Sequence, residues 1–238
     1  LLDMDGTILD LHFDNYFWQQ HLPLRYSELK TVSLEQAKKE LNKQYEEVSG
    51  TIAWYCLDYW AEKTQLPINE LKREVQHLIQ LRDDARDFLV KLKEQGYDVV
   101  LVTNAHPDSL SLKIERTRLD AYFDTLYSTH EFGVSKESQS LWSKLQQKHG
   151  FENHSTLFID DSISILDSAK KFGIEHLVAV ANPDIKMFET SVFNGQYITN
   201  DIDQGYLERL DALRNNEVKE QSDKNADSII DMHNEGAE

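Results

Sequence analysis

From Arg82 onward, short apolar runs alternate with amphipathic segments of helical period, and this alternation restricts the possible folds more than any other feature of the chain. Short β-branched runs are typical of parallel strands buried on both faces. Parallel neighbours need a long crossover, usually a helix, and the intervening segments are long enough to provide one. We therefore predict an α/β fold in which helices cover a parallel sheet. The predicted strands are Asp98–Val102, Thr125–Ser128, Thr156–Ile159 and His176–Val180, and the predicted helices are Asp83–Gly96, Asp108–Leu119, Glu137–Lys148 and Ile163–Phe172.

The chain opens with Leu1 and Leu2, directly before Asp3 and without an initiator methionine. A buried parallel strand normally contains about four to eight apolar residues. We therefore expect the chain to begin partway along its first strand, with further residues upstream.

Residues 10–81 follow a different pattern, which is helical and rich in large aromatic side chains. Helices are predicted over Ser33–Ser49, over Trp54–Trp60 and from Pro67 onward, with no strand pattern between them. We predict that residues 12–81 form an all-helical subdomain inserted into an α/β core made of residues 1–11 and 82–214. Residues 215–238 contain seven acidic residues and two lysines and few apolar ones, which predicts a disordered acidic tail.

Composition excludes several classes of protein. The chain has 25 basic and 42 acidic residues, a net charge of −17, which repels nucleic-acid polymers. No stretch is long and apolar enough to predict a membrane span. The single cysteine, Cys56, allows no internal disulfide, and we expect a reducing, cytoplasmic location. The oligomeric state is left open.

Three predicted strand ends carry acidic or hydroxyl side chains. The first is followed by Asp3-Met4-Asp5-Gly6-Thr7, the second by Thr103-Asn104, and another by Asp160-Asp161-Ser162. Any one of these turns alone would be explained as a helix cap. Ligands of open α/β sheets bind beyond the carboxyl ends of the strands, so together the three turns predict a binding site.

Four carboxylates at one place, those of Asp3, Asp5, Asp160 and Asp161, cannot all stay ionised without a counter-charge. Mg²⁺ is the hard cation that suits carboxylates, water and a substrate phosphate. The hydroxyl of Thr103 and the backbone amide of Asn104 are candidate donors to a phosphate. Lys136 precedes a predicted helix and could reach the same place, although a lone lysine there is usually a solvated surface residue.

These motifs, in this order and spacing, resemble the four-motif signature of the haloacid dehalogenase superfamily of aspartyl-phosphate phosphatases. The resemblance covers residues 1–202 and implies a Rossmann-like core with a helical cap. It implies Asp3 as the nucleophile and Asp5 as the general acid and base. An acid at position 5 points to phosphate esters as substrates, since family members that perform dehalogenation typically lack it.

The resemblance also implies how phosphate and metal are bound. Asp3, the main-chain carbonyl of Asp5, and Asp161 would hold Mg²⁺, and Asp160 would orient Lys136 or bind through water, with the two adjacent acids able to exchange roles. Thr103, Asn104 and Lys136 would stabilise the transferring phosphoryl group. Gly6 would allow the tight turn that presents its amide.

The segments LDLHFDNYFW, WYCLDYW, TNAHP and FIDDS more narrowly resemble bacterial purine 5′-nucleotidases that hydrolyse GMP and IMP. The expected partner is thus a small phosphorylated metabolite, a purine nucleoside 5′-monophosphate. Alternatives are a phosphatase of sugar phosphates or phosphoglycolate, a sugar phosphomutase, or a non-catalytic binding protein on the same fold. Candidate specificity residues are Asp14, Asn15, Tyr55, Tyr59 and His106, and most of the aromatic residues are expected to pack the helical subdomain.

Overall fold

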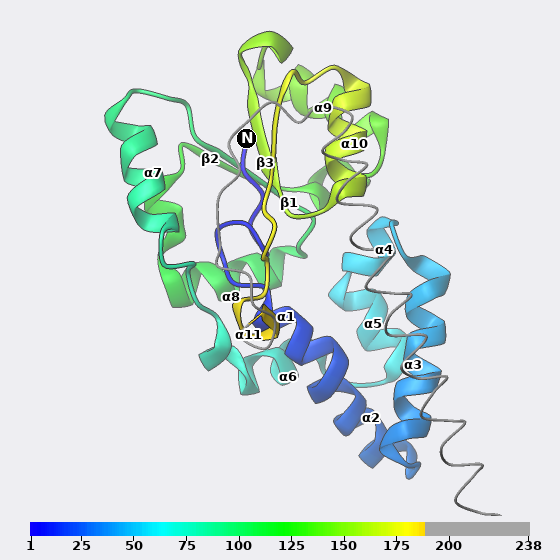
Figure 1. Cartoon of the computed structure of the whole chain (residues 1–238). Coiled ribbons are helices and arrows are strands. Elements are labelled where there is room, and N and C mark those ends of the chain that lie inside the picture. The colour runs from blue at the N-terminus through cyan, green and yellow to red at the C-terminus, as the bar shows by residue number, and fades with distance from the viewer. Residues whose placement is uncertain (189–238) are drawn as a thin grey trace, which may run out of the picture. The chain divides into compact units, whose positions relative to one another are not determined.

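A parallel sheet forms the centre of the computed structural model, which describes residues 1–188 (Figure 1). Strand β1 pairs with β2, and β3 pairs with β4. Leu2 bridges in parallel to Leu101 of β1 and to Ile159 of β3, so the N-terminal segment joins the two pairs. The strands are β1 (Val100–Thr103), β2 (Thr125–Ser128), β3 (Leu157–Asp160) and β4 (His176–Ala179), and the order across the sheet is β2, β1, the Leu2 segment, β3, β4. The predicted parallel α/β core is confirmed.

The Leu2 segment is held by backbone hydrogen bonds on both sides. The amide of Leu2 donates to the carbonyl of Val100 at 2.8 Å, and the amide of Asp3 donates to the carbonyl of Ile159 at 2.9 Å. Because parallel strands end at the same edge, this register brings Asp3, Thr103 and Asp160 together, although they are far apart in the sequence.

Helices cover both faces of the sheet because side chains alternate along each strand. On one face Phe158 packs edge-on against Trp142 of α9 (Gln139–His149), with ring centroids 5.0 Å apart. The next residue, Ile159, points to the opposite face and joins a buried cluster with Leu112. Helices α7 (Ala85–Glu94) and α8 (Pro107–Thr117) contribute to that cluster, and α10 (Ile163–Phe172) packs against β3 and β4.

The predicted helical insertion is composed of helices throughout. They are α1 (His12–Tyr16), a π-helical turn (Phe17–His21), α2 (Leu22–Lys30), α3 (Leu34–Val48), α4 (Ile52–Tyr55), α5 (Leu57–Thr64), α6 (Ile68–Glu74) and a 3₁₀ turn (Gln76–Leu78). The chain leaves and returns through two short antiparallel segments bridged at Leu9 and Leu81, where the amide of Arg82 donates to the carbonyl of Ile8 at 3.0 Å. The boundaries of the insertion as a subdomain stay a prediction.

One predicted helix is interrupted. Instead of a single helix over Trp54–Trp60, the backbone becomes extended at Cys56 (φ −85°, ψ 112°) and separates α4 from α5. Tyr55 and Tyr59, four residues apart, would share a face of the predicted single helix, but they lie on different helices, so this part of the prediction is wrong. The interruption allows Trp54 and Trp60 to meet edge-on at 5.9 Å, and the indole of Trp60 donates to the carbonyl of Trp54 at 2.8 Å.

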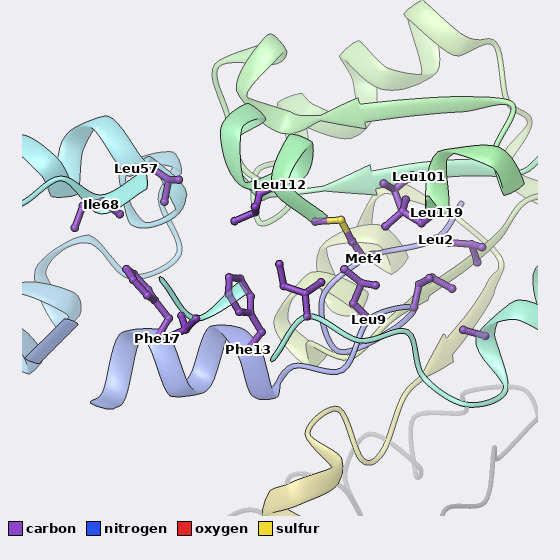
Figure 2. Packing of buried hydrophobic residues seen from close by; sticks show 14 of the residues in the cluster. Leu2, Met4, Leu9, Phe13, Phe17, Leu57, Ile68, Leu101, Leu112 and Leu119 are labelled. Carbon is purple, nitrogen blue, oxygen red and sulfur yellow. The ribbon is translucent and has the colours of Figure 1, made fainter. Parts of the chain in front are cut away.

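A continuous apolar cluster runs from the sheet into the insertion (Figure 2). Leu2, Met4 and Leu9 form its core side, and Phe13 and Phe17 of the first long helical segment extend it toward Leu57 and Ile68. Shared burial of this kind couples the stability of the insertion to that of the core.

The predicted acidic tail, residues 215–238, and the end of the predicted core, residues 189–214, lie outside the described residues. Among the residues that the structure describes, none of the helices has the length and apolarity needed to cross a membrane.

Candidate active site

Three carboxylates meet at the carboxyl edge of the sheet. Asp3, Asp160 and Asp161 each place an oxygen within 4.8 Å of the other two, and Asp3 and Asp160 are buried. Burial raises the pKa of Asp3 to about 6 and, with the charges of Asp160 and Asp3, raises the pKa of Asp161 well above its usual value. The predicted convergence of the first and last motifs is observed.

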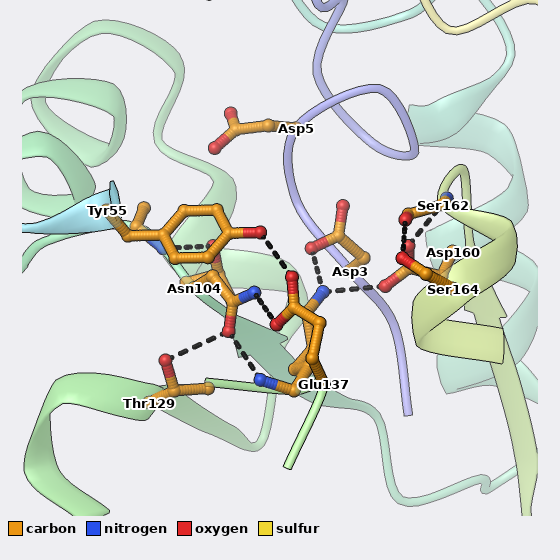
Figure 3. Close-up of polar contacts among 12 residues, drawn as sticks. Asp3, Asp5, Tyr55, Asn104, Thr129, Glu137, Asp160, Ser162 and Ser164 are labelled. Atoms are coloured by element: carbon orange, nitrogen blue, oxygen red, sulfur yellow. Dashed lines mark hydrogen bonds and ion pairs between the residues drawn. The ribbon is translucent and has the colours of Figure 1, made fainter. Parts of the chain in front are cut away.

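Lys136 lies within this group. Its side chain is 1% exposed, and its ammonium donates to a carboxylate oxygen of Asp3 and, at 2.6 Å, to Oδ2 of Asp160 (Figure 3). Burial opposes the charge, but the carboxylates of Asp160 and Asp3 outweigh it and raise the pKa of Lys136. The surface role that is usual for such a lysine is therefore excluded. We call Asp3, Asp160, Asp161 and Lys136 the strand-end cluster.

The two adjacent acids have different environments. Both oxygens of Asp160 are engaged, one by Lys136 and the other by the amide of Ser162 at 2.8 Å. Asp161 contacts no lysine or arginine among the described residues. This difference favours Asp161 as a direct metal ligand and Asp160 as the residue that orients Lys136.

The loop after β1 is fixed by a polar network (Figure 3). Oδ1 of Asn104 accepts hydrogen bonds from the hydroxyl of Thr129 at 3.0 Å and from the amide of Lys136 at 2.9 Å, and its Nδ2 donates to Glu137 at 3.2 Å. Tyr55 of the insertion donates its hydroxyl to the same Glu137 at 2.7 Å. The side chain of Asn104 thus fixes this loop, which leaves its backbone amide as the candidate phosphate donor.

Gly6 is required by two features of its position. Its φ of +86° is in the left-handed region, and a Cβ atom there would lie 2.5 Å from a carboxylate oxygen of Asp161 and 2.9 Å from Cβ of Pro183. The turn thus packs directly against the strand-end cluster.

Asp5 belongs to a second group, formed mainly by helices. Lys113 of α8 donates to Asp5 at 2.6 Å and to Asp14 of α1 at 2.7 Å, and Lys72 of α6 donates to Asp14 at 2.9 Å. The two lysine side chains are 1% and 2% exposed. We call Asp5, Asp14, Lys72 and Lys113 the two-lysine cluster.

The two-lysine cluster sets the titration of its acids. Burial raises the pKa of Asp5 to about 7, although Lys113 opposes the rise. Burial also acts on Asp14, but Lys113 and Lys72 outweigh it and lower the pKa of that carboxyl. A carboxyl with a pKa near neutrality can both donate and accept a proton at physiological pH. Asp14, a predicted specificity residue, has each oxygen bound to a lysine.

Charge balance distinguishes the clusters. When all groups are ionised, the strand-end cluster has three negative charges and one positive, while the two-lysine cluster has two of each. The strand-end cluster lacks two positive charges and offers only oxygen donors, which fits one Mg²⁺ ion. From the sequence alone, Asp5 is counted among the acids whose negative charge requires a metal ion. In the structure, Lys113 already neutralises the carboxylate of Asp5.

A cavity of about 710 Å³ opens onto both clusters. Aromatic side chains of the insertion line it, as do Asn15 and His106, whereas Tyr59 does not. Phe13, Phe17 and Trp60 are almost completely buried in the apolar cluster, as expected for most of the aromatic residues. The aromatic residues on the wall are Trp18, Tyr45, Trp54 and Tyr55.

Sequence reasoning missed Lys72 and Lys113. A signal for Lys72 was present, because with Ile68, Leu71 and Val75 it completes the i, i+3, i+4, i+7 stripe of α6. A lysine in an apolar stripe indicates a buried cation that needs a carboxylate partner. Lys113 follows the buried Leu112, a weaker signal.

Fifty-nine residues of the chain are 54% identical to part of an amidophosphoribosyltransferase from Escherichia coli (strain K12), covering 25% of this chain and 12% of that enzyme. So short a match carries no argument about catalysis. A solved HAD phosphatase from Thermococcus onnurineus has the same fold, with a TM-score of 0.67, 21% identity, and coverage of 85% of this chain and 89% of that one.

The chain is also similar to the GMP/IMP nucleotidase YrfG of Escherichia coli (strain K12), with 47% identity over 184 residues that cover 77% of this chain and 83% of the relative. The family model of the haloacid dehalogenase-like hydrolases matches residues 1–179. That span includes both clusters and the cavity wall. The chain therefore belongs to the haloacid dehalogenase-like hydrolases, among the phosphatases of that family.

Proposed function

We propose that the chain is a Mg²⁺-dependent phosphomonoesterase that uses Asp3 as its nucleophile and acts on purine nucleoside 5′-monophosphates. The observation that carries the proposal is the strand-end cluster, in which a buried aspartate, a buried lysine and two further carboxylates meet at the sheet edge. A non-catalytic binding protein would have no need of a buried, charge-compensated nucleophile beside a separately held acid.

In the proposed reaction a carboxylate oxygen of Asp3 attacks phosphorus, and the bond from phosphorus to the ester oxygen breaks. Asp5 gives its proton to the departing hydroxyl. Asp5 then accepts a proton from a water molecule that attacks the phosphorus of the aspartyl-phosphate, which releases inorganic phosphate and restores Asp3. Lys113 holds Asp5 in place for both transfers, since it donates to that carboxyl at 2.6 Å.

Lys136, the hydroxyl of Thr103 and the backbone amide of Asn104 would donate to the phosphoryl oxygens as charge develops on them. The network of Asn104, Thr129 and Glu137 supports this role, because it fixes the loop before a substrate binds. Donors that are fixed in advance need no reorganisation during the reaction.

Asp3, Asp161 and the main-chain carbonyl of Asp5 would hold Mg²⁺, and Asp160 would position Lys136. The ion would neutralise charge on the phosphate and on the carboxylates around it.

The substrate class follows from the relative's name and from the cavity wall. Trp18, Trp54 and Tyr55 offer aromatic surface for a purine. Asn15 and His106 line the cavity and carry groups able to contact a 6-oxo base, and the Nδ2 of Asn15 donates to Asp184 at 2.8 Å.

A phosphate-release assay over GMP, IMP, AMP, CMP, UMP and ribose 5-phosphate, with and without Mg²⁺, tests the proposal. We expect GMP and IMP to exceed the pyrimidine nucleotides and the sugar phosphate about tenfold to a hundredfold in kcat/KM, the value of one stacked base. Equal rates on ribose 5-phosphate would exclude base recognition, and equal rates on AMP would exclude a 6-oxo contact. Acid quenching and mass spectrometry should locate a phosphoryl group on Asp3, and phosphate on another residue would contradict its role.

A further inference from the structure

A second group of potential metal ligands lies between the insertion and the core. It consists of Cys56, His106 and His130, each of which places a ligand atom within 4.8 Å of the other two. Cys56 separates α4 from α5, His106 precedes α8, and His130 follows β2 in the 3₁₀ turn Thr129–Phe132. Three segments distant in sequence thus bring one sulfur and two imidazoles together, and none of the three takes part in the proposed chemical steps.

The two imidazole rings have the spacing that a shared ion requires. Their centroids are 5.0 Å apart and their planes cross at 79°. Two imidazoles bound to one tetrahedral zinc through bonds of about 2.0–2.1 Å would place their centroids roughly 5 Å apart. An edge-to-face ring contact has the same geometry, so the spacing permits a shared ion without requiring one.

His130 supplies an independent observation. Its Nε2 atom is buried and has no hydrogen-bond partner among the described residues. Buried polar atoms in folded proteins are nearly always satisfied, so this imidazole nitrogen has room for a partner such as an ion or a water molecule. A metal ion would supply the missing bond.

His106 is already held in place. Its Nε2 lies 3.5 Å from Oδ2 of Asp58, and its Nδ1 accepts the amide of Asp108 at 3.3 Å. A carboxylate beside a ligating imidazole commonly orients the ring. A metal ion bound at Nδ1 of His106 would leave the ring proton on Nε2, which faces Asp58. The ion would therefore replace the long hydrogen bond from the amide of Asp108 to Nδ1.

We propose that Cys56, His106 and His130 form a binding site for a transition metal ion of the Zn²⁺ type, distinct from the carboxylate site. Thiolate and imidazole donors favour Zn²⁺ or Co²⁺ over Mg²⁺, whereas the strand-end cluster offers only oxygen. A tetrahedral ion held by these three residues would take a water molecule or another group as its fourth ligand. In this assignment His106 serves the ion and is no longer a candidate contact for the base.

The site would join the insertion to the core. Cys56 belongs to the insertion, and the two histidines belong to the core. Tyr55, which directly precedes Cys56, already contacts Glu137 of the core through a hydrogen bond of 2.7 Å. A bound ion would add a strong second link beside this weak one.

Cobalt is the probe of choice, because Cys56 is the only cysteine of the chain and any thiolate-to-cobalt charge-transfer band must come from it. The full-length protein is titrated with Co²⁺ in saturating Mg²⁺, with a reductant that contains no thiol. We expect a charge-transfer band together with intense tetrahedral d–d bands, all abolished by Zn²⁺ and unaffected by further Mg²⁺. Absence of the charge-transfer band in the wild-type protein would overturn the proposal.

Variants separate a three-ligand site from a lone thiol. Cys56→Ser should remove the charge-transfer band, and His106→Gln and His130→Gln should each weaken Co²⁺ binding at least about tenfold, the lower bound for loss of a residue that supports a metal ligand. His154→Gln, an exposed histidine, is the matched control and should bind as the wild type does. Wild-type affinity in both His106→Gln and His130→Gln would also overturn the proposal, and thermal unfolding of each variant verifies that it is folded.

Discussion

The strand-end cluster and the two-lysine cluster share a cavity and the same chemistry, yet they are built in opposite ways. Acids in the first follow strand ends, where parallel pairing brings them together. In the second, three of the four residues lie on helices α1, α6 and α8. The first has an excess of negative charge, and the second is neutral. The difference supports the proposed Mg²⁺ site at the strand-end cluster, while in the two-lysine cluster Lys113 and Lys72 already balance the charges of Asp5 and Asp14.

Buried lysines of this site have opposite pKa shifts: the pKa of Lys113, like that of Lys136, is raised by its carboxylate partners, whereas the pKa of Lys72 is lowered. Lys136 has an elevated pKa because the carboxylates of Asp160 and Asp3 outweigh its burial. Lys72 has a lowered pKa because its burial outweighs the attraction of Asp14. Lys72 also lies 4.8 Å and 4.6 Å from the ring centroids of Phe13 and Phe17, so aromatic faces supply part of its environment.

The largest effect is expected from Asp3→Asn, which removes the nucleophile and changes almost no volume. Turnover of GMP should fall at least about 10⁴-fold, as when other covalent nucleophiles are removed. Steady-state phosphate release measures the loss, and thermal unfolding verifies the fold. Retention of a few per cent of activity, with deamidation excluded by mass spectrometry, would remove Asp3 from this role.

Lys113→Met should be the most damaging change in the two-lysine cluster. It leaves the half-buried carboxylate of Asp5 without a partner and that of Asp14 with Lys72 alone, and breaking a buried pair costs up to about 3–5 kcal/mol. Urea unfolding measures the free energy, and activity should fall because Asp5 loses its support. Lys93→Met is the control, since Lys93 pairs with Asp124 at half-exposed positions and should cost less than about 1 kcal/mol. Equal costs for the two variants would contradict the buried cluster.

Gly6→Ala tests the close contact between the first turn and Asp161. Gly50→Ala is a matched control, because Gly50 also has a left-handed φ, of +73°, but nothing lies within 4 Å of the position that a Cβ atom would take there. Both should lose roughly 1–2 kcal/mol for the backbone, and Gly6→Ala about 1–3 kcal/mol more for crowding. Only Gly6→Ala should lose turnover. Similar stability and activity in the two variants would show that the turn is not packed against the site.

The smallest effect is expected from Arg73→Gln, directly after Lys72. Arg73 pairs with Glu115 of α8 at 3.1 Å, but both side chains are more than half exposed. Exposed pairs contribute less than about 1 kcal/mol, so stability and kcat/KM should hardly change. A loss as large as that of Lys113→Met would mean that exposed links, as much as buried ones, hold the insertion on the core.

Much of the fold was predictable from local pattern. The four later strands and the helices between them follow from periodicity, with boundaries displaced by a few residues. Strand β1, for example, begins at Val100 because the amide of Val99 donates to the side chain of Asp124 at 2.9 Å. The break at Cys56 was not predictable, since the sequence around it is helical in character and the indole contact to Trp54 forms only in the folded insertion.

The sequence by itself determined the parallel sheet, the strand-end residues and their approach to one another, because parallel strands must end at one edge. Only the tertiary structure decided which acidic and basic side chains pair with one another. Lys113 is more than a hundred residues from Asp5 along the chain, and no local pattern encodes their pairing. It likewise decided that Asp160 faces Lys136 while Asp161 does not, and that Cys56 meets two histidines of the core. The physical reason is that periodicity reports which face of an element is buried, whereas partners across that face depend on how elements pack.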